Sequence, residues 1–69
     1  MIRALRLRRR RRNLQRSLDG VLYALAATRA QRAEYERRGY DYAAFALKDP
    51  IEFYKWEAAR IADELESLS

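Results

Sequence analysis

Apolar residues recur at helical spacing in the first half of the chain. Four aliphatic positions are separated by four, three and four residues, and three further positions continue their register: Leu14, Leu18, Val21, Leu25, Thr28, Arg32 and Tyr35. We call this set the first seam. Its spacing is that of one face of an α-helix. It predicts a helix from about Asn13 to Arg38, with Gly39 as a left-handed C-terminal cap.

A second seam occupies the C-terminal part of the chain, with alternating spacings of three and four residues: Ile51, Tyr54, Ala58, Ile61, Leu65 and Leu68. The start of this seam has the residues of a helix N-terminus. Asp49 can serve as the N-cap, Pro50 as the first helical residue, and Glu52 as the capping-box partner of Asp49. The sequence therefore predicts a second helix that is capped by Asp49 and has Pro50 as its first residue.

Residues 40–48 separate the two predicted helices and contain neither Gly nor Pro. They are compatible with a short helix capped by Asp41, with Tyr42 and Phe45 turned inward, or with an aromatic-rich loop. In either case the fold class is all-α. A long basic helix and a shorter acidic helix form an antiparallel helical hairpin, with residues 1–12 as a basic N-terminal arm and residues 13–69 as the hairpin domain.

Size and composition restrict the function. A chain of 69 residues makes at most one domain and buries a small core, so its stability is expected to depend on self-association or on a larger complex. Without Cys or His it has no disulfide, no thiolate, no imidazole base and no zinc site. Its carboxylates lie at helix-surface spacing, and no Gly-rich loop could hold a phosphate. We expect a protein that is not an enzyme and has no cofactor or metal.

Charge is unevenly distributed along the chain. Residues 1–38 contain twelve arginines and three acidic residues, a net charge of +9, whereas residues 39–69 contain three basic and seven acidic residues, a net charge of −4. Packing the two helices together would neutralise part of this charge. Arginines remain in excess between Arg3 and Arg16, and this excess predicts an anionic partner.

Residues 5–16, LRLRRRRRNLQR, resemble the arginine-rich helical motifs that bind structured RNA or follow a phosphate backbone. Guanidinium groups suit this role because they keep their charge and donate two parallel hydrogen bonds to phosphate or base edges. Like charges at helical spacing repel, so we expect the arm to be frayed when free and helical when its charges are met. The candidate nucleic-acid-binding residues are Arg3, Arg6, Arg8, Arg9, Arg10, Arg11, Arg12, Asn13 and Arg16. An acidic protein surface, anionic lipid or solvent alone could also face these arginines.

Apolar residues also lie outside the two seams. Tyr23, Phe53, Trp56 and Arg60 are candidate partner-binding residues, because buried aromatic side chains dominate the energetics of interfaces. In the alternative interpretation Trp56 covers Arg60 in a cation-π pair and Phe53 packs on residues 40–48. Gly20 costs about 1 kcal/mol within a helix and could mark a bend or a close helix contact.

These observations predict a small nucleic-acid-binding protein that uses its arginine-rich N-terminal helix on RNA or DNA and its helical hairpin for self-association. The alternative is a structural adaptor or accessory subunit of a larger assembly, such as a virion, that binds an acidic protein surface. No run of about 18 apolar residues is present, so no transmembrane segment is expected. The expected location is cytoplasmic.

Overall fold

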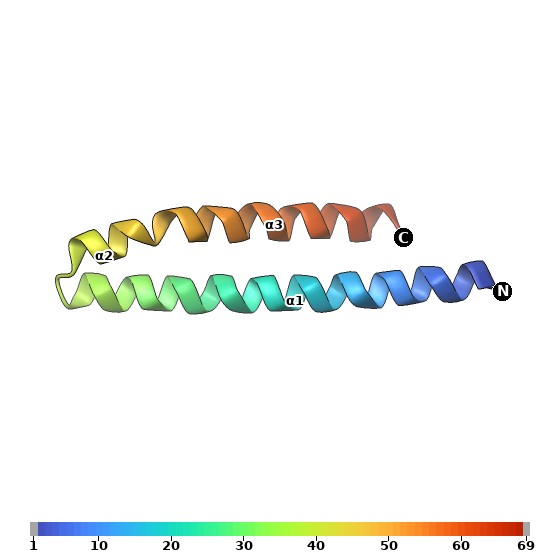
Figure 1. Ribbon diagram of the computed structural model, residues 1–69, viewed down its shortest axis with the longest axis horizontal. Helices are drawn as coiled ribbons and strands as arrows, with labels where there is room; N and C mark the ends of the chain where they lie inside the picture. The colour runs from blue at the N-terminus through green and yellow to red at the C-terminus, as the bar shows by residue number, and fades with distance from the viewer. Residues whose placement is uncertain (1, 69) are drawn as a thin grey trace.

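Three helices make up the computed structural model, which describes residues 2–68: α1 (Ile2–Arg37), α2 (Asp41–Ala46) and α3 (Lys48–Ser67). Helix α1 runs the length of the molecule, and α2 and α3 return beside it in the opposite direction (Figure 1). The predicted all-α hairpin is confirmed. Its Cα radius of gyration is 16.2 Å, compared with about 11 Å for a compact domain of this length. The molecule is therefore a rod.

Helix α1 begins at Ile2, much earlier than the Asn13 start that the first seam predicts. Arginine is a good helix former, so the N-terminal residues continue the helix even though they add few seam positions. The backbone passes from residue 12 to residue 13 without interruption. The basic arm is thus the N-terminal part of one long helix.

The turn after α1 is a Schellman motif. Gly39 has a φ of 79°, its N–H donates to the Glu36 carbonyl at 3.1 Å, and the Tyr40 N–H donates to the Tyr35 carbonyl at 2.8 Å. The rings of Tyr35 and Tyr40 pack with their centroids 6.2 Å apart, which supplies the apolar contact typical of this motif. The predicted left-handed cap at Gly39 is confirmed.

The two predicted seams face each other between α1 and α3. Leu25 of the first seam and Ile51 and Ile61 of the second are buried, while the other seam residues are half-buried. Both seams are therefore confirmed as core. This core is thin, because Ala44 is the only other buried residue among those that the structure describes.

Residues 40–48 contain the short helix α2, but two details of the prediction were wrong. Tyr40 occupies the N-cap position without a side-chain hydrogen bond, and Asp41 is the first helical residue. Tyr42 and Phe45 point outward, with 85% and 66% of their surface exposed, while Ala44 is buried. The helical period of α2 turns Ala43, Ala44 and Leu47 toward the core, which leaves Tyr42 and Phe45 on the opposite side.

Helix α3 begins at Lys48, with Leu47 as its N-cap and no side-chain capping bond, so the predicted Asp49 cap was wrong. Pro50 has no N–H to donate to the carbonyl four residues earlier, which explains why α2 ends at Ala46. The Leu47 N–H bonds to Ala44 at 3.2 Å, and the Leu47 carbonyl accepts from Ile51 at 3.1 Å. Backbone groups therefore replace the predicted cap. Glu52, the predicted partner in the capping box, is paired with Lys55 instead.

Gly20 marks no close helix contact within the hairpin. A Cβ atom built on it meets no atom within 4 Å, and α1 continues through it without a break. The space around this residue is open solvent.

Candidate nucleic-acid interface

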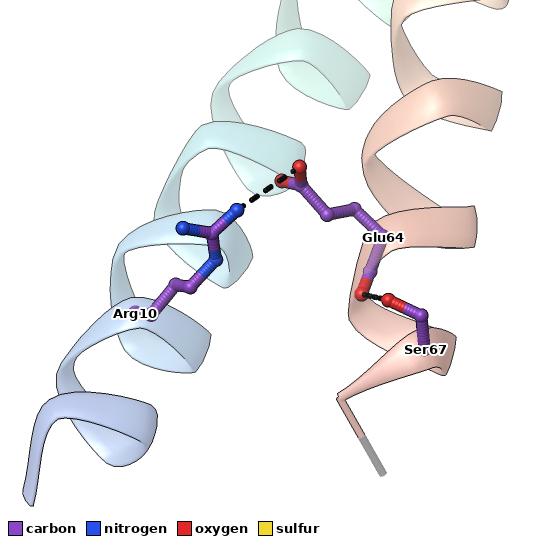
Figure 2. Close-up of polar contacts among 3 residues, drawn as sticks. All are labelled: Arg10, Glu64 and Ser67. Atoms are coloured by element: carbon purple, nitrogen blue, oxygen red, sulfur yellow. Dashed lines mark hydrogen bonds and ion pairs between the residues drawn. The ribbon is translucent and has the colours of Figure 1, made fainter. Parts of the chain in front are cut away.

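The N-terminal end of α1 projects past the end of α3 (Figure 1). Two polar contacts mark where the helices part. The Arg10 guanidinium pairs with Glu64 at 3.3 Å (Figure 2), and Nη2 of Arg11 donates to the Leu68 carbonyl at 2.7 Å. We call residues 2–9, which precede both contacts, the overhang. It is a helical segment attached to the hairpin at one end only.

Every charged residue of the overhang and of the helical turns that follow it is an arginine. The first acidic residue of the chain is Asp19. Six of the predicted binding arginines have no acidic partner among residues 2–68: Arg3, Arg6, Arg8, Arg9, Arg12 and Arg16. Successive residues are rotated by about 100° around a helix, so the guanidinium groups surround it. The N-terminal end of the helix dipole adds further positive potential.

The arginines also repel one another at helical spacing. Seven pairs are three or four residues apart: Arg3–Arg6, Arg6–Arg9, Arg6–Arg10, Arg8–Arg11, Arg8–Arg12, Arg9–Arg12 and Arg12–Arg16. Each such pair costs about 0.2–0.5 kcal/mol in an exposed helix, so the seven pairs together cost roughly 1.4–3.5 kcal/mol. This charge arrangement weakens the free helix and would be relieved by a bound anion.

Shallow recesses lie between the arginine side chains. Arg8, Arg9 and Arg12 line one of them together with Leu5. A second recess lies on another side of the helix and is lined by Arg6, Arg9, Arg10, Asn13 and Leu14. The structure therefore brings most of the predicted binding residues into two adjoining clusters that share Arg9. Spaced guanidinium donors of this kind can hold phosphate oxygens.

Three arginines at the C-terminal end of α1 form ion pairs within the chain. Arg32 pairs with Glu36 at 3.1 Å, Arg38 pairs with Glu34 at 2.6 Å, and Arg37 also contacts Glu34. Their charges are met within the chain. Most arginines without an acidic partner among residues 2–68 therefore lie in the N-terminal half of α1, and Arg29 is the exception.

The predicted partner-binding residues fall on two separate helices. Tyr23 lies on α1 and is 78% exposed. It is two residues from both Val21 and Leu25, about 200° around the helix from the first seam. Phe53 and Trp56 lie on α3 and are 57% and 63% exposed. The structure therefore brings Phe53, Trp56 and Arg60 together on one helix but leaves Tyr23 apart.

Among the described residues, Trp56 does not form the cation-π pair with Arg60 that the alternative interpretation expected. The Phe53 ring packs edge-on against Tyr54, with the centroids 5.7 Å apart. Arg60 donates to both carboxylate oxygens of Glu57, at 3.4 and 3.1 Å, and this contact raises the pKa of Arg60 above its ordinary value. The cation above a ring is Lys48, 5.9 Å from the centroid of Phe45.

Two exposed aromatic residues, Tyr42 and Phe45, were missing from the predicted partner surface. Their spacing contains the signal that could have identified them, because they begin a series of positions three or four residues apart: Tyr42, Phe45, Asp49, Phe53, Trp56 and Arg60. Such a series follows one side of a helix. It runs along the outer side of α2 and α3, away from the second seam.

No protein-family model, curated protein or solved structure matches the chain. Residues 2–68 contain no cluster of three or more potential metal ligands among their acidic side chains. None of the helices described is both long and apolar enough to cross a membrane.

Proposed function

We propose that this chain binds nucleic acid through the overhang and the adjoining turns of α1, and that the hairpin holds copies of the chain together. The observation that supports binding most directly is the set of arginines without acidic partners on a helix that projects from the hairpin. Each guanidinium that neutralises a phosphate releases condensed counterions, and this release is a main source of affinity for nucleic acids.

The dimensions of the overhang favour a groove. An α-helix with its side chains is about 10–12 Å wide, which matches the roughly 12 Å major groove of B-DNA. The major groove of A-form RNA is deep and narrow, so RNA would accept this helix where a bulge or loop widens the groove. Because arginines surround the helix, both phosphate backbones that border a groove could be contacted at once.

The test is a salt titration of binding to a labelled duplex. The overhang variant changes Arg3, Arg6, Arg8 and Arg9 to Gln. A matched control changes Arg29, Arg32, Arg37 and Arg38 to Gln, which removes the same charge from the C-terminal end of α1 and the residue that follows it. For the intact chain we expect the logarithm of the binding constant to fall steeply with the logarithm of salt concentration.

Each phosphate contact contributes about 0.9 to the slope on B-DNA. The overhang variant should therefore lose up to about 3 to 4 units of slope, together with most of the affinity at low salt. The control should keep the slope of the intact chain. Equal losses in both variants would show that net charge alone drives binding, and no binding by the intact chain at moderate salt would refute the proposal.

A second candidate is an adaptor that docks its overhang in an acidic groove of another protein. It is favoured by the apolar residues between the arginines, since Ile2, Leu5 and Leu7 are all exposed and phosphate contacts would not use them. Changing Ile2 and Leu7, which line neither arginine recess, to Ser separates the two functions. Nucleic-acid binding should persist in this variant, whereas docking in a protein groove should weaken because apolar burial is lost.

A further inference from the structure

The outer side of α3 carries large apolar side chains that the hairpin does not cover. Phe53 and Trp56 lie at its centre, and both are more than half exposed. Asp49 and Arg60 flank them, four residues before Phe53 and four residues after Trp56. We call these four residues the outer stripe. Their spacing of four, three and four residues is that of a helix-packing seam.

The charges of the outer stripe distinguish between two ways of pairing it with a second copy. In a parallel pair Asp49 would meet Asp49 of the other copy, and Arg60 would meet Arg60, so that like charges face each other at both ends. In an antiparallel pair Asp49 meets Arg60 twice, and Phe53 lies opposite Trp56. The stripe is therefore electrostatically self-complementary in the antiparallel direction alone.

The surface area of the chain is consistent with a missing partner. The hairpin exposes 5787 Å², compared with about 4,500 Å² for a compact monomer of its mass. The excess is larger than the roughly 800 Å² that each partner buries in a stable interface of standard size. The outer side of α1 offers less apolar area, because Tyr23 is surrounded there by alanines.

We infer that the outer stripe of α3 is the contact surface of an antiparallel homodimer, with Asp49 of each copy facing Arg60 of the other. This inference deepens the self-association in the proposed function by naming its surface and its direction. The ion pairs within one chain do not prevent it. Arg60 is bonded to Glu57 through part of its guanidinium group, and it keeps donors for a second carboxylate.

Trp56 is the only tryptophan of the chain, so its fluorescence reports directly on this surface. It is exposed in the single hairpin and would be buried against Phe53 of the other copy. The emission maximum should therefore move to shorter wavelength as protein concentration rises, in parallel with dimer formation measured by sedimentation equilibrium.

Chemical crosslinking between introduced cysteines tests the direction of pairing. The natural chain contains no cysteine, so only the introduced thiols can react. One variant carries Asp49→Cys and another carries Arg60→Cys. A short bismaleimide should join the two variants when they are mixed. Neither variant should crosslink with itself, because in the antiparallel pair two copies of the same position lie about 16 Å apart along the helices. Crosslinking of Asp49→Cys with itself would show a parallel pair and overturn the inference.

Charge reversal provides a test that needs no cysteine. Asp49→Arg or Arg60→Asp alone places two like-charge pairs in the dimer and should weaken it by roughly tenfold. The double variant Asp49→Arg with Arg60→Asp restores both pairs and should recover most of the affinity. An intact chain that stays monomeric at every concentration, or a double variant no better than the singles, would overturn the inference. Nucleic-acid binding by the overhang is measured separately, so failure of one proposal leaves the other open.

Discussion

Arg6 has the greatest number of like-charged neighbours in the overhang. It lies three or four residues from Arg3, Arg9 and Arg10. Changing Arg6 to Gln removes three repulsive pairs, and changing it to Glu also introduces three attractive ones. At about 0.2–0.5 kcal/mol per pair, the expected gain in local helix stability is about 1 kcal/mol for Gln and about 2 kcal/mol for Glu. Acidic charge near a helix N-terminus adds to the effect of Glu.

Amide hydrogen exchange measures this gain residue by residue. The N–H groups of residues 7–10 form the hydrogen bonds of these turns, so at low salt their protection should rise about fivefold in the Gln variant and about thirtyfold in the Glu variant. In 1 M salt the Debye length falls to about 3 Å, and the differences between the variants should largely disappear.

Amides of residues 26–30 in the same samples are the internal control, since they lie far along α1 and should not respond. Protection factors of residues 7–10 that stay within twofold of the natural chain at low salt would refute the repulsion argument. They would also remove one reason for assigning an anionic partner to the overhang.

Three further predictions concern the hairpin. Substitution by alanine should have opposite effects at the two glycines. Gly20→Ala should stabilise the chain by about 0.5–1 kcal/mol, because the added Cβ meets nothing within 4 Å. Gly39→Ala should destabilise it by about 1–2 kcal/mol, because φ is 79° at this residue. Urea unfolding followed by circular dichroism at one fixed protein concentration checks both signs, and a destabilising Gly20→Ala would indicate that another helix packs on that side of α1. In the same assay, Ile61→Ala should lower the free energy of unfolding by about 2–5 kcal/mol, because Ile61 is buried. Leu22→Ala changes an exposed residue and should lower it by less than about 1 kcal/mol. Equal losses would show that the core between the two helices is not what stabilises the chain. Glu64→Gln breaks the exposed pair with Arg10 and should change stability by less than about 1 kcal/mol, so a larger loss would mean that this contact anchors the overhang.

The two seams and the cap at Gly39 could be predicted from the sequence because each depends on local spacing. An interval of three or four residues identifies a helix face whatever lies opposite it, and a glycine after two arginines is a common helix end. The candidate arginines were equally accessible to prediction, since an excess of one charge can be counted. The sequence could not show which arginines lack an acidic partner, because this depends on where α3 ends beside α1.

The errors arose where two helices compete for the same residues. Asp49 and Pro50 have the composition of a helix start, but α2 lies directly before them and supplies the backbone partners that a side-chain cap would otherwise provide. Tyr42 and Phe45 are large and apolar, so hydrophobicity alone places them in the core. Their exposure follows from the orientation of α2, which turns Ala43, Ala44 and Leu47 inward instead, and no single segment of sequence specifies that orientation.

Because α1 passes without interruption from the hairpin into the overhang, the proposed binding segment is joined to the hairpin by continuous helix and not by a flexible linker. Each residue inserted near the point where the helices part would advance the overhang by about 1.5 Å and rotate it by about 100°. A bound duplex would therefore be held at one azimuth relative to α3. In the proposed antiparallel dimer the two overhangs would point in opposite directions, so two bound duplexes would be held at opposite ends of one rod.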